Sequence, residues 1–245
     1  MRITIFNGSP KGERSNTLKV AAEFAEGARS AGAEVEVVHL AGLKIGHCLG
    51  CFHCWEKEPG VCVLKDDMGG QLRKVAASDL AVFATPLYID NVSGMTKVFM
   101  DRLTPLVDPK IFRDEAGECF HRTRLPKNPR LGVISSCGFP EQRHFDVLKL
   151  LFRRVARNLD SELAFEIYRD AGPVMAVAPF LLKDAFGRYR DLLREAGAQV
   201  VRDGAISQET AAALAEPLLP PDRYVESSNA RFQRLLSKLK DTGAA

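Results

Sequence analysis

Residues 2–17 read RITIFNGSPKGERSNT and join a β-rich run to a polar loop that contains glycine. The run Arg2–Asn7 is rich in apolar and β-branched residues and stops at Gly8, which predicts a short buried strand. The loop ends in Ser15, a residue type that often caps helices, and apolar residues at helical spacing continue to about Ser30. A strand, a polar loop and a helix in this order predict the first βα unit of a parallel sheet.

Four more β-rich runs alternate with helical patterns along the chain. The further strands are expected over Val35–Leu40, Asp79–Thr85, Leu131–Ser136 and Leu163–Tyr168. The further helices are expected from Asp66 or Asp67 to about Ala77, after Ser93, around residues 148–159, and two or three times after Pro179, the last with Phe232, Leu235, Leu236 and Leu239 at helical spacing. This order predicts the α/β class, with a doubly wound five-stranded parallel sheet covered on both faces.

We expect one domain over residues 1–200 and a helical C-terminal extension over residues 201–245 that is not an independent domain. Residues 108–130 are polar, rich in charge and without clear periodicity, so they are expected to form a long excursion. Such a segment is either a functional lid or partner contact, or a solvated insertion. Ligands of doubly wound sheets bind beyond the carboxyl ends of the strands, which directs attention to the loops after the first, third and fourth strands.

Composition sets limits on the class of function. The 245 residues are 46% hydrophobic and 27% charged, typical of a globular protein with a substantial core. With 34 basic and 31 acidic residues, the net charge of +3 is too small to favour nucleic acid or an anionic membrane as a partner. The opening MRITIFNGSP reaches glycine and proline too early for a signal peptide, and no apolar run is long enough to cross a bilayer. A cytoplasmic protein is expected.

Four cysteines, Cys48, Cys51, Cys54 and Cys62, lie within the run CLGCFHCWEKEPGVC. The spacing C-x2-C-x2-C-x7-C places three thiols on a tight loop and a fourth nearby, which favours a [4Fe–4S] cluster. Zinc fits three successive ligands less well, and disulfides need an oxidising compartment. Thiols that line a loop without any ligand are the remaining alternative. His47 and His53 lie within or beside the run and are interpreted as loop histidines.

The loop after the first strand predicts a phosphate site. Ser9, Ser15, Asn16 and Thr17 surround the start of a helix, where hydroxyls, an amide and free backbone N–H groups would bind an anion. The loop lacks both the Walker A ending and the G-x-G-x-x-G pattern. Helix capping by Ser15 or Asn16 is the simpler alternative, although capping needs only one such residue.

The other two loops suit a flat heterocycle. The first of them offers Pro86, Leu87, Tyr88 and Asn91, where Tyr88 would stack on a ring or line its edge, or else plug the end of the sheet. The second offers Ser136, Cys137 and Gly138, with Cys137 interpreted as a plain buried thiol. A phosphate site beside a slot for a planar ring describes FMN.

The chain at this point resembles a known family. The segments MRITIFNGSPKGERSNTLKV, CLGCFHCWEKEPGVCVLKDDM and SDLAVFATPLYIDNVSGMTKVFMDR look like NADPH-dependent FMN reductases of the flavodoxin-like superfamily, and specifically like its iron–sulfur flavoprotein branch. The resemblance covers about the first 105 residues, and SSCGFPE at residues 135–141 extends it.

The resemblance implies a flavodoxin-like fold, non-covalent FMN, a homodimer or homotetramer, and electrons from a nicotinamide or a ferredoxin-type donor. Ser9, Ser15, Asn16 and Thr17 would hold the FMN phosphate, Pro86, Leu87 and Tyr88 would contact the isoalloxazine, and the four clustered cysteines match the iron–sulfur branch in order. The sequence does not choose between NADH and NADPH, because single basic residues such as Arg14 or Arg102 are weak evidence for a 2′-phosphate site.

The expected function is an FMN-dependent oxidoreductase that passes electrons from NAD(P)H to a quinone, a flavin, a nitro or azo compound, or an iron–sulfur centre. The main alternative is an electron carrier with FMN and a [4Fe–4S] cluster but no small-molecule turnover, and a third is a zinc-stabilised binding module. FMN itself carries out the redox chemistry, so no catalytic side chain is named. His121 and His144 are candidates to protonate an acceptor, or are simply solvated or packed.

Overall fold

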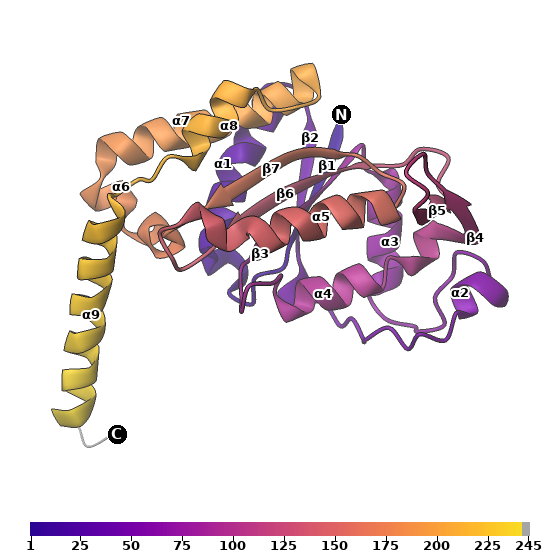
Figure 1. The fold of residues 1–245 in the computed structure, drawn as a ribbon, viewed down its shortest axis with the longest axis horizontal. Coiled ribbons are helices and arrows are strands. Elements are labelled where there is room, and N and C mark those ends of the chain that lie inside the picture. Colours follow the sequence, from indigo (N-terminus) through magenta and orange to yellow (C-terminus); the bar gives the residue numbers. More distant parts are fainter. Residues whose placement is uncertain (242–245) are drawn as a thin grey trace.

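Five parallel strands form the central sheet in the order β2–β1–β3–β6–β7 (Figure 1). The computed structural model describes residues 1–241. The strands are β1 (Arg2–Asn7), β2 (Glu34–His39), β3 (Leu80–Pro86), β6 (Arg130–Ser136) and β7 (Leu163–Arg169). Every residue of β3 is buried, as expected for a central strand with helices on both faces. Taken in sequence, the sheet order is 2-1-3-4-5, the flavodoxin-like order, so the predicted fold class is confirmed.

Helices connect the strands and continue beyond the last one. They are α1 (Asn16–Ser30), α2 (His53–Glu56), α3 (Met68–Ala77), α4 (Gly94–Asp101), α5 (Asp146–Asn158), α6 (Ala178–Leu181), α7 (Lys183–Asp203), α8 (Gln208–Ala215) and α9 (Pro221–Asp241). The predicted strands and helices that form the sheet and its layers are present with ends shifted by a few residues. No helix within residues 1–241 combines the length and the apolar character that crossing a bilayer requires.

Each face of the sheet has its own hydrophobic core. On one face, α1, α7 and α8 pack against the strands around residues such as Ile5 and Leu193. On the other face, α3, α4 and α5 pack around residues such as Phe83 and Phe152. Burial of these apolar side chains, at about 25 cal/mol per Å² of surface removed from water, stabilises the layered arrangement.

The helices α1 and α7 approach each other closely because glycine lies at the contact on both sides. A Cβ on Gly27 would lie 1.8 Å from the carbonyl oxygen of Arg194, and a Cβ on Gly197 would lie 2.0 Å from that of Phe24. Any larger residue at either position would force the two backbones apart. The C-terminal helix α7 is therefore an integral layer of the sheet domain.

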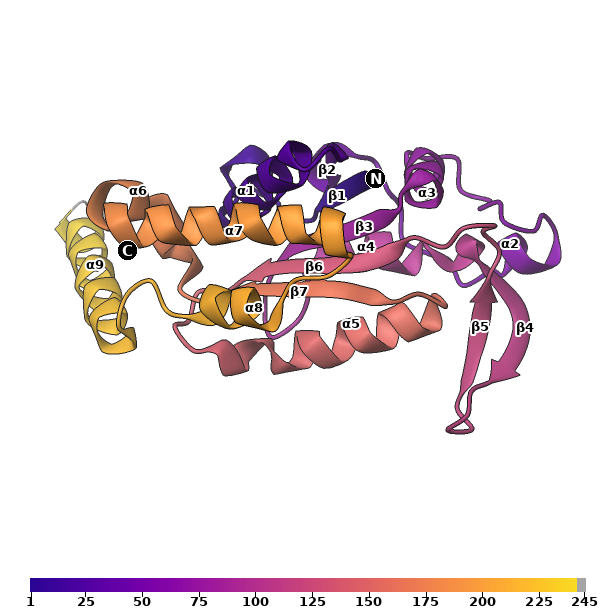
Figure 2. The ribbon, with the colours of Figure 1, turned by 90° about the horizontal axis from the view of Figure 1, so that it is seen from above.

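Residues 107–123 differ from the sequence-based expectation. They form an antiparallel hairpin of β4 (Val107–Arg113) and β5 (Cys119–Thr123) that extends past the end of the main sheet (Figure 2). Both strands mix polar and apolar residues and are only partly buried, with a β-bulge between paired positions, so they lack the apolar alternation by which strands are detected. The prediction of an irregular excursion was wrong for this part.

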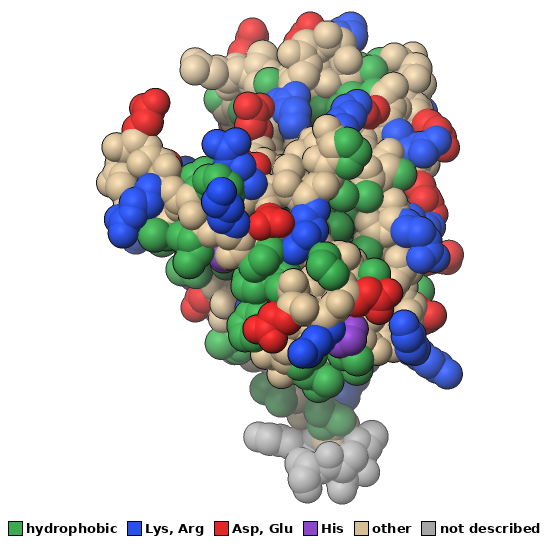
Figure 3. All heavy atoms as spheres, turned by 90° about the vertical axis from the view of Figure 1, so that its right-hand side faces the viewer, with side chains coloured by type: hydrophobic (Ala, Val, Ile, Leu, Met, Phe, Trp, Pro, Cys, Tyr) green, Lys and Arg blue, Asp and Glu red, His purple; other side chains and the backbone are tan. Residues whose placement is uncertain are grey.

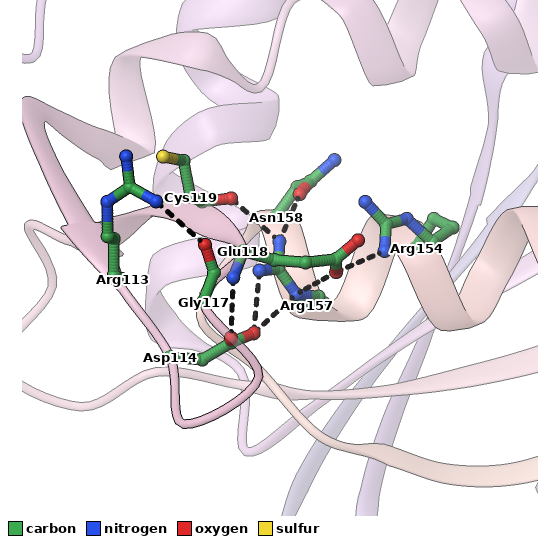
Figure 4. Close-up of polar contacts among 8 residues, drawn as sticks. All are labelled: Arg113, Asp114, Gly117, Glu118, Cys119, Arg154, Arg157 and Asn158. Atoms are coloured by element: carbon green, nitrogen blue, oxygen red, sulfur yellow. Dashed lines mark hydrogen bonds and ion pairs between the residues drawn. The ribbon is translucent and has the colours of Figure 1, made fainter.

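Ionic contacts fix the hairpin to α5 (Figure 4). Asp114 accepts a hydrogen bond from Arg157 Nη2 at 2.7 Å, and Glu118 accepts one from Arg154 Nη1 at 2.7 Å. Arg157 also donates to the carbonyl oxygen of Cys119 at 2.8 Å. On its other side the hairpin reaches the cysteine segment, because the ring of His121 lies 4.9 Å from that of Trp55.

The last helix, α9, projects from the body of the molecule (Figure 1). It confirms the helix predicted around Phe232, and its apolar side chains are exposed: Val225, Phe232, Leu235, Leu236 and Leu239. Its first turn is held to the body by Tyr224, which is buried beside Ala171, Val174 and Ala178.

Candidate functional site

Four loops meet at the carboxyl ends of β1, β3, β6 and β7 and enclose a cavity of about 160 Å³, here called the strand-end cavity. Its lining consists of Ser9, Lys11, Ser15, Asn16, Thr17, Pro86, Leu87, Tyr88, Ser136, Cys137, Gly138, Gly172 and Pro173. All three loops singled out from the sequence contribute to it, as expected for the ligand-binding edge of a doubly wound sheet.

The polar wall of the strand-end cavity is built by the start of α1. Ser15 caps this 15-residue helix, since its Oγ accepts a hydrogen bond from the backbone N–H of Leu18 at 3.2 Å. The next backbone N–H groups, of Asn16 and Thr17, have no acceptor within residues 1–241. The side-chain amide of Asn16 also lacks a partner there. Orphan N–H groups and the positive end of the helix dipole make this wall a site for an anion.

The loop before α1 is held open by contacts with its neighbours. The Oγ of Ser9 accepts a hydrogen bond from the backbone N–H of Lys11 at 3.3 Å, and the hydroxyl of Thr17 lies 2.7 Å from that of Ser136. Gly8 is required here, because a Cβ at this position would lie 1.8 Å from Oγ1 of Thr96 in α4. The first loop, the third strand-end loop and α4 are thus locked together.

Tyr88 is presented by a tight turn. The backbones of Tyr88 and Asn91 exchange hydrogen bonds of 2.9 and 3.1 Å, and the two residues between them, Ile89 and Asp90, have φ angles of 47° and 53°. Both angles lie in the left-handed region, which a β-branched residue such as Ile89 rarely adopts, so the turn stores strain. Tyr88 is 44% exposed and lies at the mouth of the strand-end cavity.

Cys137 contributes a neutral thiol. It is buried, its Sγ donates a hydrogen bond to the carbonyl oxygen of Phe139 at 3.2 Å, and burial raises its pKa to about 11. A thiol that stays protonated is a poor nucleophile. The interpretation of Cys137 as a plain buried thiol agrees with this geometry.

The structure brings together the predicted residues of all three loops, with one exception. Asn91 does not line the strand-end cavity but closes the turn that presents Tyr88. Three lining residues were not predicted: Lys11, Gly172 and Pro173. The pair Gly172–Pro173 follows the fifth strand, so the strand-end rule applied to that strand as well would have found it.

The four clustered cysteines line a second and larger cavity of about 480 Å³, here called the cysteine cavity. Cys48 and Cys51 are exposed, Cys54 is buried and Cys62 is half-buried. Burial and the neighbouring thiols, Cys62 foremost, raise the pKa of Cys54. Within residues 1–241, no three His, Cys, Asp or Glu side chains lie close enough together to hold a metal ion. The thiols share one cavity without converging on one point.

The backbone around these thiols turns sharply. Phe52, between Cys51 and Cys54, has a φ of 52°, and Gly50 and Gly60 are also left-handed. The single turn of α2 follows, and Trp55 Nε1 donates to the carbonyl oxygen of Thr104 at 3.2 Å. His53 lines the cavity but lies 3.7 Å from Glu58, whereas His47 does not line it. Figure 3 shows this end of the molecule, where exposed apolar side chains lie among charged side chains of both signs.

Arg102, which lines the cysteine cavity, belongs to a buried ion pair. Arg102 is 1% exposed; its Nη1 and Nη2 donate to the two oxygens of Asp66 at 2.7 and 3.0 Å, and Nη1 also donates to the carbonyl oxygen of Gly46 at 2.8 Å. Hydrogen bonding from Arg102 lowers the pKa of Asp66, which outweighs burial. Arg102 is therefore not available to a nucleotide 2′-phosphate.

Both candidate histidines are packed. His121 lies against Trp55, and His144 stacks on Phe139 with ring centroids 4.6 Å apart and pairs with Glu141 at 3.2 Å. Neither lines the strand-end cavity. The packed alternative, which the sequence left open for both, describes their surroundings.

The N-terminal part of the chain is similar to known proteins. Residues 1–120 match the family model described as NADPH-dependent FMN reductase. An iron–sulfur flavoprotein of Archaeoglobus fulgidus is 41% identical over 100 residues, which are 40% of this chain and 43% of that protein. One of Methanocaldococcus jannaschii is 35% identical over 106 residues, or 43% of this chain and 53% of that protein. The chain thus spans about half the length of these curated relatives, and the resemblance found in the sequence is confirmed.

Solved structures share the fold over most of the chain. An FMN-dependent NADH-azoreductase from Bacillus anthracis, solved in complex with FMN, superposes with a TM-score of 0.55 at 17% identity and covers 82% of this chain and 99% of that one. An NAD(P)H:quinone oxidoreductase from Methanothermobacter marburgensis superposes with a TM-score of 0.58 at 15% identity and covers 83% and 98%. At such identities the likeness establishes the fold.

Proposed function

We propose, from the match of residues 1–120 to NADPH-dependent FMN reductases, that this chain is an FMN-dependent oxidoreductase that takes electrons from NAD(P)H and passes them to an acceptor. The observation that carries the proposal is the strand-end cavity. It combines unpaired helix amides, hydroxyls and an aromatic ring at the ligand-binding edge of a flavodoxin-like sheet. When bound, FMN would accept a hydride and release electrons one or two at a time.

The start of α1 would hold the phosphate of FMN. The free N–H groups of Asn16 and Thr17, with the hydroxyls of Ser9 and Ser15, provide donors on one wall. The cavity of about 160 Å³ is smaller than a typical ligand pocket and suits the narrow phosphate end of the molecule. Lys11, at the edge of the same cavity, adds a positive charge.

The mouth of the cavity would receive the planar ring. Tyr88, Leu87 and Pro86 offer an apolar and aromatic edge there, and Gly138 offers backbone without a side chain in the way. Asn91 serves this surface indirectly by fixing the turn that carries Tyr88. The strain of that turn is typical of positions at which a ligand is held.

The four clustered cysteines would hold a [4Fe–4S] cluster. The donor set fits: four thiols line one cavity with room for a cubane, and Asp101, the carboxylate in the same lining, is paired with Lys97. A cluster would supply one-electron transfer, whereas zinc would supply only structure. Binding requires the side chains of the exposed Cys48 and Cys51 to turn inward toward Cys54 and Cys62.

A single helix, α4, connects the two cavities. Its N-cap, Ser93, accepts a hydrogen bond from the backbone N–H of Thr96 and donates one to the carbonyl oxygen of Gly8 beside the strand-end cavity. Its C-cap, Arg102, lines the cysteine cavity. Eight helical residues rise by about 12 Å, so the two sites are close enough to work as one redox unit.

We expect the protein to act in the cytoplasm, where its thiols stay reduced, as a homodimer or homotetramer. The projecting α9 supports self-association, because its exposed apolar face needs cover. Its first half carries Asp222 and Glu226 beside Arg223, and its second half carries Arg231 and Arg234. Two copies of α9 paired antiparallel would therefore bring the two acidic residues of one copy toward the second-half arginines of the other. The acceptor is a small molecule such as a quinone, flavin, nitro or azo compound, or a redox protein.

Anaerobic purification with a visible spectrum, an iron and zinc count and an NADPH oxidation assay tests the proposal. We expect bound FMN, about four iron atoms per chain for one cubane, and NADPH turnover with a quinone or free flavin. Iron and FMN without turnover would instead indicate an electron carrier that needs a protein partner. Zinc without iron would favour a binding module. Protein that takes up no FMN from excess ligand contradicts the proposal.

A further inference from the structure

The side chain of Arg102 is almost completely buried. It is 1% exposed, and its ion-pair partner Asp66 has a side chain that is only 16% exposed. The Asp66 carboxylate is itself fixed by the backbone N–H groups of Gly46 and Met68, at 2.9 and 3.1 Å. The backbone thus fixes the Asp66 carboxylate, and the carboxylate in turn orients the guanidinium of Arg102. Because both side chains are already ordered, a further hydrogen bond from the guanidinium costs little conformational entropy.

One nitrogen of this guanidinium has no partner. Nη1 and Nη2 bind Asp66 and Gly46, but the buried Nε has no hydrogen-bond partner within the described chain. Buried N–H groups are almost always paired, so an orphan of this kind calls for an acceptor. The cysteine cavity is the place where such an acceptor would lie, because Arg102 forms part of its wall.

Cys62 is the candidate acceptor, because its thiol lines the same cavity as Arg102. Burial is the largest influence on the pKa of Arg102 and lowers it, but the neighbouring Asp66 and Cys62 raise that pKa. A thiolate accepts a charge-assisted hydrogen bond far better than a thiol does. The Asp66 carboxylate balances the arginine charge, so the effect on Cys62 is local and directional.

We propose that Arg102 is a positioning residue for the cluster, which orients the sulfur of the ligand Cys62 through a hydrogen bond from Nε. The inference rests on the proposed function, since it presumes that the four cysteines bind iron. Hydrogen bonds to ligand sulfur stabilise the more negative, reduced state of an iron–sulfur cluster and so raise its reduction potential. Arg102 would therefore set how readily the cluster accepts an electron.

Arg102→Lys tests this in the anaerobically reconstituted full chain. Lysine keeps the charge beside Asp66 but has no Nε–H in the guanidinium plane. We expect the cluster potential, measured by EPR-monitored redox titration, to fall, and iron loss to a chelator to become about tenfold faster. Arg124→Lys is the matched control: this arginine pairs with Asp108 and does not line the cysteine cavity, so potential and iron loss should stay as in the wild type.

A second measurement needs no variant. Wild-type protein grown with ¹⁵N-arginine and reduced should show a weak ¹⁵N hyperfine coupling between one guanidinium nitrogen and the cluster in pulsed EPR. Absence of that coupling, or an Arg102→Lys protein with wild-type potential and iron loss, would overturn the role of Arg102 while leaving the cluster in place. A wild type that binds FMN but no iron would overturn the cluster, and the role of Arg102 with it.

Discussion

The hydroxyl of Tyr224 donates a hydrogen bond of 2.6 Å to the carbonyl oxygen of Gly138 and so joins the first turn of α9 to the loop after β6. The two residues are 86 positions apart, and Gly138 lines the strand-end cavity. Tyr224 is 9% exposed, so this bond forms in a nearly dry environment. The projecting helix is therefore anchored directly on a loop of the candidate flavin site.

Tyr224→Phe removes this anchor while it keeps the aromatic ring. We expect the free energy of unfolding to fall by about 1 kcal/mol, because the carbonyl of Gly138 loses its partner. The FMN dissociation constant should rise a few-fold as the loop loosens. Chemical denaturation and fluorescence titration measure the two effects. Tyr88→Phe serves as the stability control, since the Tyr88 hydroxyl has no hydrogen-bond partner in the described structure; unchanged stability in Tyr224→Phe would contradict the anchoring role.

The phosphate site can be separated from helix capping by a pair of variants. Asn16→Ala removes a side chain without a partner in the free protein, so it should raise the FMN dissociation constant about tenfold, worth about 1.4 kcal/mol, with little loss of stability. Ser15→Ala also removes the cap of α1 and should cost about 1 kcal/mol of stability in addition.

Ser207→Ala is the matched control for these two. Ser207 caps α8 in the same way, by accepting from the backbone N–H of Thr210 at 3.1 Å, but it does not line the strand-end cavity. Stability should fall as in Ser15→Ala while FMN binding stays unchanged. If Asn16→Ala binds FMN like the wild type, the phosphate does not lie at the start of α1.

Cys51→Ser should abolish the broad visible absorbance of an iron–sulfur cluster and leave the flavin bands intact. A cubane needs four ligands, and serine is a poor substitute for a thiolate toward iron. Cys119→Ser is the control, because Cys119 is exposed on β5 and does not line the cysteine cavity. The comparison is read from absorbance and iron content of anaerobically purified protein. Persistence of the absorbance in Cys51→Ser would remove this residue from the ligand set.

The Asp66–Arg102 pair should make stability depend on pH in the acid range. The hydrogen bond from Arg102 lowers the pKa of Asp66 in the folded state, so folding favours the deprotonated carboxyl. The stabilisation is then complete above the unfolded pKa near 4 and is lost as the pH falls through the lower, folded value. Acid titration of the wild type should show this loss.

Asp66→Asn should accordingly cost about 3 kcal/mol at pH 7, because it leaves a buried guanidinium without its counter-ion, and clearly less at about pH 3. Asp146→Asn is the comparison, since Asp146 forms an exposed pair with Lys149 and should matter little at either pH. Equal losses for Asp66→Asn at the two pH values would mean that the pair contributes shape rather than charge.

The central sheet was predictable because its strands carry a strong local signal. Buried runs such as Leu131–Ser136 alternate with helical patterns, and the direction of parallel strands then places their end loops together. This is why residues as distant as Thr17 and Ser136 could be assigned to one site, and their hydroxyls do lie 2.7 Å apart. The predicted topology alone places these two residues at the same edge of the sheet.

What the sequence could not supply depends on tertiary contacts without a local pattern. The hairpin of β4 and β5 mixes polar and apolar residues and is held by ion pairs with α5. Its sequence therefore lacks the apolar alternation that would predict a strand. The partner of Arg102 lies 36 positions away, in a segment expected only to cap a helix. A guanidinium looks the same in sequence whether it meets solvent, a nucleotide or a buried carboxylate.

The chain contains a single tryptophan, Trp55, which directly follows Cys54 in α2, next to the cysteine cavity. Its indole donates to Thr104 and lies against His121 of the hairpin and Phe52 of the cysteine loop. Intrinsic fluorescence excited at the red edge of protein absorption therefore reports on one small region of a 245-residue molecule. Trp55 is therefore a native fluorescent probe beside the proposed iron site. Iron loading of that site can be followed by the quenching of its fluorescence, without any added dye.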